Sequence, residues 1–555
     1  MSATIPVFLS EKGDDGFVTR SMRRRWRTAV VFLALAGPVL VLLATAKYGA
    51  GLTTDSVAYL DGASNLMSGK GFVSHTGEPL IWWPPFYPAL LALIGSVTRL
   101  DPSAFAHIVN AILFGLLILL SARLLRTGLR LTAGFGVLGV CAMVFSVPLS
   151  AIYAMTWSEC LFVPLVVLSL VCAERYRESR SVVMLLMMVV STALACLTRY
   201  IGVALVPTGI LVIMLAPEAN LRTRLLRAGG FAVFSLAPLG FWLLRNYQQA
   251  GTLSGNRFHP VFELVTNIIL LVTSMLSWYE PLGLAVKSAS GAGAQGAKSA
   301  SLSINLFVAL VGVCALAAAL ALSRPARTRL SRGIRAVLWH HQPTAIFVAV
   351  YSAVLVLLAA RGASSFVDQR LLSPLYVPAT VLLLKLAYSV LGQERAAPTA
   401  LSRRLPLVLL SLWLCFPLAW VLRSTARRYE NGAGGYNTRI WRESNTIAQA
   451  SRLPSADSGN YLYSNGRDVL WALARVSASW VPSRTEVALG DLRGRWPASP
   501  ATVVWFDSIT WRKHLFSVDE LGEIAVVETV AQLDDGSVYR FSVREAPAQD
   551  LALPR

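Results

Sequence analysis

Residues 20–55 read RSMRRRWRTAVVFLALAGPVLVLLATAKYGAGLTTD, and this stretch decides the fold class. Its middle part, residues 28–46, carries no charge and is long enough to cross the hydrocarbon core of a bilayer as one helix. The residues before it include Arg20, Arg23, Arg24, Arg25 and Arg27. Because basic residues beside a span are retained in the cytoplasm, this segment predicts a first span that delivers Asp55 to the outer face. The small residues at 44–46 would also fit a signal-peptidase site, but the apolar run is longer than a usual signal core, so we expect the span to be retained.

The composition extends this prediction to most of the chain. Of its 555 residues, 55% are hydrophobic and 14% are charged, and so large an apolar excess is typical of a protein embedded in lipid. A formal charge of +20 could indicate a nucleic-acid partner. However, the basic residues gather in short segments between apolar runs, and no basic-aromatic stripe is present. We therefore expect membrane lipids and no nucleic acid among the partners.

Apolar segments long enough to be spans recur along residues 28–422. We place them at 28–46, 104–122, 132–150, 157–173, 182–197, 201–216, 228–244, 302–323, 343–360, 371–391 and 405–422. Every second connection is rich in arginine, which is typical of cytoplasmic loops. The pattern predicts a polytopic all-α membrane protein of about 11 transmembrane helices in the cell membrane. Residues 1–27 would form a basic cytoplasmic N-terminus, and the odd number of spans would place the C-terminal region outside.

Two of the predicted outer loops are long, at residues 47–103 and 246–301. In the first, residues 84–95 are too short to span and rich in proline and aromatic residues, so they predict an interfacial or re-entrant helix. In the second, residues 261–276 are apolar and could form a twelfth span. That alternative would bring the C-terminal region back to the cytoplasm.

Residues 423–555 have the composition of a small extracytoplasmic α/β domain. Alternating apolar residues predict strands in YLYSN (461–465), ATVVWFD (501–507), AVVETV (525–530) and VYRFSV (538–543). The run Asp534-Asp535-Gly536-Ser537 predicts a hairpin turn between the last two strands. We also expect helices at 437–452 and 466–474.

Two acidic residues at the predicted outer ends of spans are candidates for catalysis. Asp55 follows the first span, and Glu159 opens the fourth span. An acid at a helix N-terminus can simply complement the helix dipole. The two carboxylates could instead hold Mg²⁺ or Mn²⁺ together with phosphate oxygens of a substrate. Both alternatives remain open at the level of sequence.

Three arginines lie at predicted outer ends of spans, against the general distribution of positive charge. They are Arg199 in LTRYIG, Arg245 in WLLRNYQQAG and Arg370 in FVDQRLLSPLYVP. Arginine at a helix end can reach the headgroups as a plain anchor. Its planar guanidinium also binds two phosphate oxygens at once, so the set predicts a binding site for a donor phosphate.

The first outer loop carries a group of residues suited to a lipid or acceptor entrance. They are Tyr59, His75, Trp82, Trp83 and Tyr87. For His75, a solvated loop histidine is the simpler interpretation. No Walker loop, G-x-S-x-G nucleophile or H-E-x-x-H helix occurs in the sequence, so nucleotide-driven pumping and these hydrolase classes are not indicated.

Several motifs resemble the GT-C superfamily of integral-membrane glycosyltransferases, in particular its protein O-mannosyltransferase and aminoarabinose-to-lipid-A transferase branch. The matching segments are TTDSVAYLDGASNL around Asp55, GKGF at 69–72, PPFYPALLAL at 84–93, SECLF around Glu159, LTRYIG around Arg199, FWLLRNY around Arg245 and QRLLSPLYVP around Arg370. Together they cover most of residues 28–391. Many members of the superfamily have two adjacent acids in the first loop, whereas here Ser56 follows Asp55. Metal dependence and substrate are therefore not carried over.

The resemblance implies transfer of a hexosyl or pentosyl group from a polyprenyl-phosphate-linked donor to a lipid, protein or glycan acceptor on the outer face. It implies that Asp55 is the catalytic aspartate. The chemistry requires a base for the acceptor hydroxyl and cations for the departing phosphate, and a single displacement would invert the anomeric carbon. Two other functions remain open: a flippase or transporter for lipid-linked glycans, and a non-catalytic scaffold for envelope assembly.

Overall fold

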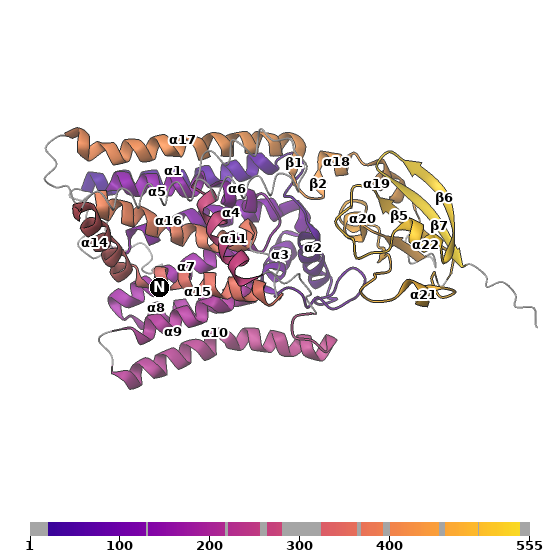
Figure 1. The fold of residues 1–555 in the computed structure, drawn as a ribbon, viewed down its shortest axis with the longest axis horizontal. Helices are drawn as coiled ribbons and strands as arrows, with labels where there is room; N and C mark the ends of the chain where they lie inside the picture. The colour runs from indigo at the N-terminus through magenta and orange to yellow at the C-terminus, as the bar shows by residue number, and fades with distance from the viewer. Residues whose placement is uncertain are drawn as a thin grey trace, which may run out of the picture. The chain divides into compact units, whose positions relative to one another are not determined.

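The computed structural model describes residues 20–128, 131–216, 220–255, 263–279, 324–362, 368–391, 400–453, 461–497 and 499–543. Two compact units can be separated, and Figure 1 labels their helices and strands. The first unit comprises residues 1–44, 81–87 and 107–426, and the second comprises residues 45–80, 88–106 and 427–555.

The first unit is a bundle of helices (Figure 1). Their bounds are α1 Arg20–Thr45, α4 Pro102–Arg126, α5 Ala133–Val144, α6 Val147–Tyr153, α7 Glu159–Ser179, α8 Val182–Thr198, η1 Tyr200–Ala204, α9 Leu205–Met214, α10 Leu221–Ala250, α11 Leu264–Ser277, α14 Arg324–His340, α15 Gln342–Ala360, α16 Gln369–Leu391 and α17 Ala400–Asn431. Every predicted span within the described residues coincides with a helix or a consecutive pair of helices. The predicted span at 302–323 lies outside the described residues.

Among the described helices, 6 are long and apolar enough to cross a membrane, or up to 7 if the bent pair α5–α6 counts as one span. Large apolar side chains on these helices are exposed, for example Phe234 and Phe241 on α10 at 68% and 73%. Such surfaces are stable only against lipid. The protein is therefore a multi-pass membrane protein. The predicted number of 11 is not reached by this criterion. Helices α8 and η1–α9 are shorter apolar helices, α7 is not among the qualifying helices, and 302–323 lies outside the described residues.

Helix α11 has 14 residues and covers the segment that could have formed a twelfth span. A bilayer crossing needs about 20 residues, so α11 is too short to cross alone. Helix α3, Phe86–Thr98, coincides with the predicted short helix of the first loop and has 13 residues.

The second unit contains helix α2, Thr54–Met67, part of α3, and the C-terminal α/β domain. The strands are β1 Gly432–Gly434, β2 Asn437–Thr438, β3 Tyr461–Ser464, β4 Ser479–Trp480, β5 Ala501–Phe506, β6 Ala525–Leu533 and β7 Gly536–Val543. The larger sheet has the order β4-β3-β5-β7-β6. Strand β3 pairs in parallel with β4 and β5, whereas β7 is antiparallel to β5 and β6. The domain buries its own apolar core, which includes Val503, Leu521 and Phe541.

The four predicted strands and the tight turn between β6 and β7 are confirmed, with Leu533 paired to Gly536. Helix α20, Arg467–Ala474, confirms the prediction at 466–474. The single helix predicted at 437–452 is wrong. The structure has β2 followed by α18 Arg439–Arg442 and α19 Asn445–Ala450, because Ser444 caps a new helix by accepting a hydrogen bond from the backbone N–H of Ile447. The remaining short helices are α21 Leu489–Leu492 and α22 Val518–Gly522.

Candidate functional site

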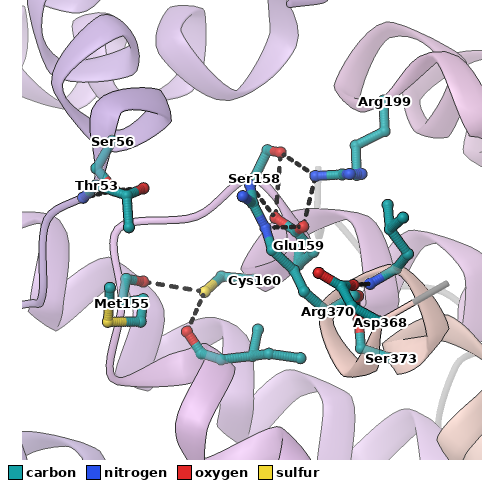
Figure 2. A network of polar contacts seen from close by, with 12 residues as sticks. Thr53, Ser56, Met155, Ser158, Glu159, Cys160, Arg199, Asp368, Arg370 and Ser373 are labelled. Carbon is teal, nitrogen blue, oxygen red and sulfur yellow. Dashed lines mark hydrogen bonds and ion pairs between the residues drawn. The ribbon is translucent and has the colours of Figure 1, made fainter. Parts of the chain in front are cut away.

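The Glu159 carboxylate is the centre of a charged cluster in the first unit. Glu159 is the first residue of α7 and only 1% exposed. Arg199 Nη1 lies 2.6 Å from its Oε1, and Arg370 Nε lies 2.5 Å from the same oxygen. Arg370 Nη2 also donates to Oε2 at 3.3 Å. Figure 2 shows both guanidinium groups pointing at this one carboxylate.

The ends of three helical elements bring these side chains together. Arg199 lies between α8 and η1 in an extended conformation, with φ −148° and ψ 136°, which interrupts the helical path. Arg370 is in the first turn of α16, next to Asp368, whose Oδ1 accepts a hydrogen bond from the backbone N–H of Leu371 at 2.8 Å. The sequence separation between Glu159 and Arg370 is 211 residues, so packing of the whole bundle is required to form the pair.

The guanidinium groups of Arg199 and Arg370 have fixed partners and remain partly exposed to solvent. The side chains of Arg199 and Arg370 keep 17% and 22% of their surface, compared with 1% for Glu159. Arg370 also lies over the ring of Trp157, 4.4 Å from its centroid, and Arg199 Nη1 donates to Ser158 Oγ at 3.2 Å. Two guanidinium groups thus share one carboxylate in a position where an anion can still reach them.

Arg245 belongs to a different polar-aromatic cluster. Its guanidinium lies 4.8 Å from the ring centroid of Trp242, and its Nη1 donates to Asn246 Oδ1 at 3.2 Å. Trp242 Nε1 and Asn246 Nδ2 both donate to the hydroxyl of Tyr200, which donates to the carbonyl of Ile81 at 2.9 Å. Of the three predicted arginines, the structure therefore joins Arg199 and Arg370 on Glu159 and places Arg245 in a separate group.

Asp55 lies in the second unit, at the second residue of α2. Its side chain is partly exposed. The first turn is closed by Thr53, whose backbone N–H donates to Ser56 Oγ at 3.0 Å. A carboxylate in the first turn of a helix is favoured by the free backbone N–H groups and the helix dipole. The first turn of α2 thus presents Asp55 as a partly solvated acid.

The predicted entrance residues divide into exposed and buried ones. Trp82 is 39% exposed, and Trp83 is partly exposed. Tyr59 and Tyr87 are 2% and 0% exposed, so their side chains contribute to packing. The interpretation of His75 as a solvated loop residue is wrong.

The His75 side chain is only 6% exposed and makes two contacts within the second unit. Its ring stacks on Trp471 with centroids 4.7 Å apart, and its Nδ1 lies 2.9 Å from Asp61 Oδ2. Asp61 also accepts from the backbone N–H of His75. A buried carboxylate that binds both the ring and the backbone of a loop residue fixes the loop, which explains why this polar position could not be recognised as buried from sequence.

The described residues contain no group of three or more His, Cys, Asp or Glu side chains that could hold a metal ion. Both oxygens of Glu159 accept hydrogen bonds from arginine. The positive charges of Arg199 and Arg370 would repel a metal cation at this carboxylate. The environment of Glu159 therefore fits an organiser of arginines better than a metal ligand.

Other polar residues of the structure were not singled out from sequence. Trp157 carries the guanidinium of Arg370, while Tyr436, Asp468 and Arg512 form a second buried cluster in the second unit. Trp157 directly precedes the SECLF motif, which was a usable signal. Nothing in the sequence distinguishes Asp468 or Arg512 from ordinary surface charges of a small domain.

Comparison with known proteins gives a fold. No protein-family model matches the chain, and no curated protein matches its sequence. The crystal structure of ArnT from Cupriavidus metallidurans in the apo state aligns with a TM-score of 0.58 at 13% identity, over 93% of this chain and 98% of that chain. The chain therefore shares its fold with ArnT over nearly all of its residues.

The same ArnT bound to undecaprenyl phosphate aligns with a TM-score of 0.55 at 12% identity, again over 93% of this chain and 98% of that chain. The alignment therefore includes both the helical bundle and the C-terminal α/β domain. The predicted resemblance is confirmed at the level of fold.

Proposed function

We propose that this protein is a GT-C glycosyltransferase that transfers a sugar from a polyprenyl-phosphate-linked donor to an acceptor hydroxyl on the outer face of the membrane. The observation that carries the proposal is the Glu159 cluster, in which two guanidinium groups share one buried carboxylate. Two positive guanidinium groups surround one negative carboxylate, so the cluster has a net charge of one positive unit. A structure of similar fold binds undecaprenyl phosphate, which is the leaving group of such a donor.

The reaction is a single displacement at the anomeric carbon. Asp55 accepts the proton of the acceptor hydroxyl while the hydroxyl oxygen attacks. The bond between the anomeric carbon and the phosphate oxygen breaks, and the electron pair leaves with the polyprenyl phosphate. Because attack and departure occur on opposite faces, the anomeric configuration inverts.

The arginines act on the leaving group. As the glycosidic bond breaks, negative charge builds on the phosphate, and fixed cations stabilise that charge more than the ground state. Arg199 and Arg370 supply these cations, and Arg245 contributes a further one from its own cluster. Glu159 orients the first two arginines, whose mutual repulsion would otherwise drive them apart.

The proposed topology has the N-terminus in the cytoplasm and the C-terminal domain outside. Arginine-rich connections on alternate sides of the spans support it. Trp82 and Trp83 would then lie beside the point where the polyprenyl chain enters from lipid.

The decisive experiment follows the bond that breaks. Purified protein in liposomes receives a panel of polyprenyl-phosphate-linked pentoses and hexoses, and released polyprenyl phosphate is measured together with sugar on added acceptors. A transferase releases polyprenyl phosphate and passes the sugar on. A flippase moves the intact lipid-linked sugar across the bilayer without cleavage, and a scaffold does neither, so either result would overturn the proposal.

A further inference from the structure

Asp468, on helix α20, accepts three side-chain hydrogen bonds within the second unit. It is 4% exposed. Its Oδ2 accepts hydrogen bonds from Thr54 Oγ1 at 2.7 Å, from the Tyr436 hydroxyl at 2.8 Å and from Arg512 Nη2 at 2.7 Å. Three segments far apart in sequence therefore meet on one oxygen atom: the first turn of α2, the segment after β1, and the loop before α22.

The backbone of the segment before α2 is held by the same part of the C-terminal domain. Leu52 N donates to the carbonyl of Gly434 at 3.2 Å, and Tyr436 N donates to the carbonyl of Leu52 at 2.7 Å. Asn437 Nδ2 donates to the carbonyl of Ala50 at 2.8 Å. Residues 50–54 are thus bound along both their backbone and the Thr54 side chain.

The close approach also explains a glycine. Gly435 has φ +59°, a left-handed conformation that suits glycine, and a Cβ there would lie 1.8 Å from the carbonyl oxygen of Leu52. Any other residue would push the two segments apart. The contact between residues 50–54 and the C-terminal domain is therefore built into the backbone.

Arg512 completes the cluster electrostatically. Its guanidinium neutralises Asp468 and lies 4.3 Å from the ring centroid of Trp480. The Arg512 and Asp468 side chains are only 8% and 6% exposed. A buried ion pair with several additional hydrogen bonds is well suited to fix geometry, because each partner has few alternative positions.

Thr54 is the first residue of α2, and Asp55 is the second. A hydrogen bond to the Thr54 side chain therefore limits rotation and translation of the turn that carries Asp55. In displacement reactions, a misplacement of the reacting group by about 1 Å can cost on the order of 100-fold in rate. Asp468 is thus connected to Asp55, the proposed base, through Thr54, which directly precedes Asp55 in the chain.

We infer that Asp468, together with Thr54 and Tyr436, is a positioning group that makes the C-terminal domain part of the catalytic machinery. The inference rests on the proposed function of Asp55. Asp468 does not touch the reacting atoms. It fixes the first turn of α2, so that the Asp55 carboxylate meets the acceptor hydroxyl in a productive geometry.

The test uses three graded variants of the full-length protein, Thr54→Val, Tyr436→Phe and Asp468→Asn. The first two remove one hydroxyl each at nearly constant shape, and the third removes the charge. The matched control is Glu528→Gln, which breaks an exposed ion pair with Arg540 on strands β6 and β7 of the same domain. We expect kcat to fall by about 10- to 100-fold in Asp468→Asn and less in the other two, with the KM for the donor changed by less than about threefold. The control should match wild type.

A double-mutant comparison separates positioning from general damage. If Thr54 acts through Asp55, Thr54→Val should have no further effect on the residual rate of Asp55→Asn, because the group it positions is already lost. An equal fall in both backgrounds would mean a structural defect and would overturn the inference. Normal kcat in all three single variants, with Asp55→Asn inactive, would overturn it too while leaving the proposed function intact.

Hydrogen exchange gives a reading that does not depend on activity. The amides of residues 50–57 should exchange faster in Asp468→Asn than in wild type, while the core strand β5 keeps its protection. Unchanged exchange at 50–57 would show that the cluster does not hold this segment. If the wild-type protein transfers no sugar, the proposed function fails, and the exchange data alone decide whether the cluster restrains α2.

Discussion

The protein contains two buried carboxylates that look alike at first and differ in charge balance. Glu159 and Asp468 are 1% and 4% exposed, and each is paired with an arginine that lies over a tryptophan ring. Asp468 has one guanidinium partner and two hydroxyl donors, from Thr54 and Tyr436. Glu159 has two guanidinium partners.

This difference in charge balance indicates different roles for the two clusters. At Asp468 one guanidinium, that of Arg512, is hydrogen-bonded to the carboxylate, and this neutral pair is suited to fixing structure. At Glu159 one negative charge meets two guanidinium groups, and the arginines keep enough exposed surface to accept a further anion. The comparison teaches that counting the cations on a buried acid separates a positioning cluster from a binding cluster.

Replacing the acid should therefore reduce the stability of the folded protein more at Glu159 than at Asp468. In Glu159→Gln two guanidinium groups face each other without a carboxylate. Breaking a fully buried ion pair costs about 3–5 kcal/mol, and the partial exposure of the arginines should reduce this to about 2–3 kcal/mol. Thermal unfolding in detergent, followed by tryptophan fluorescence, measures the loss.

The matched control for this variant is Glu178→Gln on the same helix. Glu178 forms an exposed pair with Arg175 at 3.7 Å, and such pairs contribute about 0–1 kcal/mol. Equal stability of the two variants would show that Glu159 does not hold the arginines together.

Removing one arginine should affect binding of the donor phosphate. Loss of a hydrogen bond to a charged group costs about 1.5–3 kcal/mol, so Arg370→Ala should bind undecaprenyl phosphate about 10- to 100-fold more weakly. The control is Arg361→Ala, which removes an exposed arginine at the C-terminal end of the neighbouring helix α15. Identical affinity of wild type and Arg370→Ala would reduce Arg370 to a structural partner of Glu159.

Low pH should weaken the Asp468 cluster. Burial raises the pKa of Asp468, but the charge of Arg512 and hydrogen bonds from Arg512, Thr54 and Tyr436 outweigh burial and hold the pKa below its usual value. Arg467 is a further charge facing this carboxylate. A lowered folded-state pKa stabilises the protein above the ordinary aspartate pKa of about 3.9, and this contribution is lost as pH falls through the folded-state value.

The difference in unfolding temperature between wild type and Asp468→Asn should therefore be full at pH 7 and shrink below about pH 4. Glu528 forms only an exposed ion pair, so Glu528→Gln provides the reference for the general effect of low pH on stability. A difference that stays constant down to pH 2 would contradict the assignment of Asp468 as an ionised member of its cluster.

Chelation should have the smallest effect. If Glu159 organises arginines, EDTA should leave turnover of the purified protein unchanged within about twofold. Loss of turnover on chelation, with recovery on added Mg²⁺ or Mn²⁺, would instead support the metal site that the sequence left open at Asp55 and Glu159.

The positions of helices and strands were largely predictable because they follow from hydrophobic patterning. A span needs only an apolar run, and β6 and β7 need only alternation around a turn at Asp534-Asp535. The failure at 437–452 has a local cause, since Ser444 caps a second helix within a segment that otherwise favours one. The two-residue strand β4 is too short to produce a pattern.

The sequence allowed several residues of the candidate site to be selected, but it did not show which of them contact one another. Asp55, Glu159 and Arg370 could be selected because charged residues at span ends are costly. Their partners depend on packing over long separations, such as the 414 residues between Thr54 and Asp468. Burial of His75 has the same origin, because the Trp471 ring that covers it comes from the C-terminal domain.

The central claim is that Asp55 removes the proton from the acceptor hydroxyl during sugar transfer. The most direct measurement compares polyprenyl-phosphate release by wild type and Asp55→Asn, with undecaprenyl-phosphate binding measured on the same samples. General-base assistance contributes about 10²–10⁴-fold in rate, so the account predicts a loss of that size in Asp55→Asn with binding retained. Wild-type release by Asp55→Asn would contradict the account.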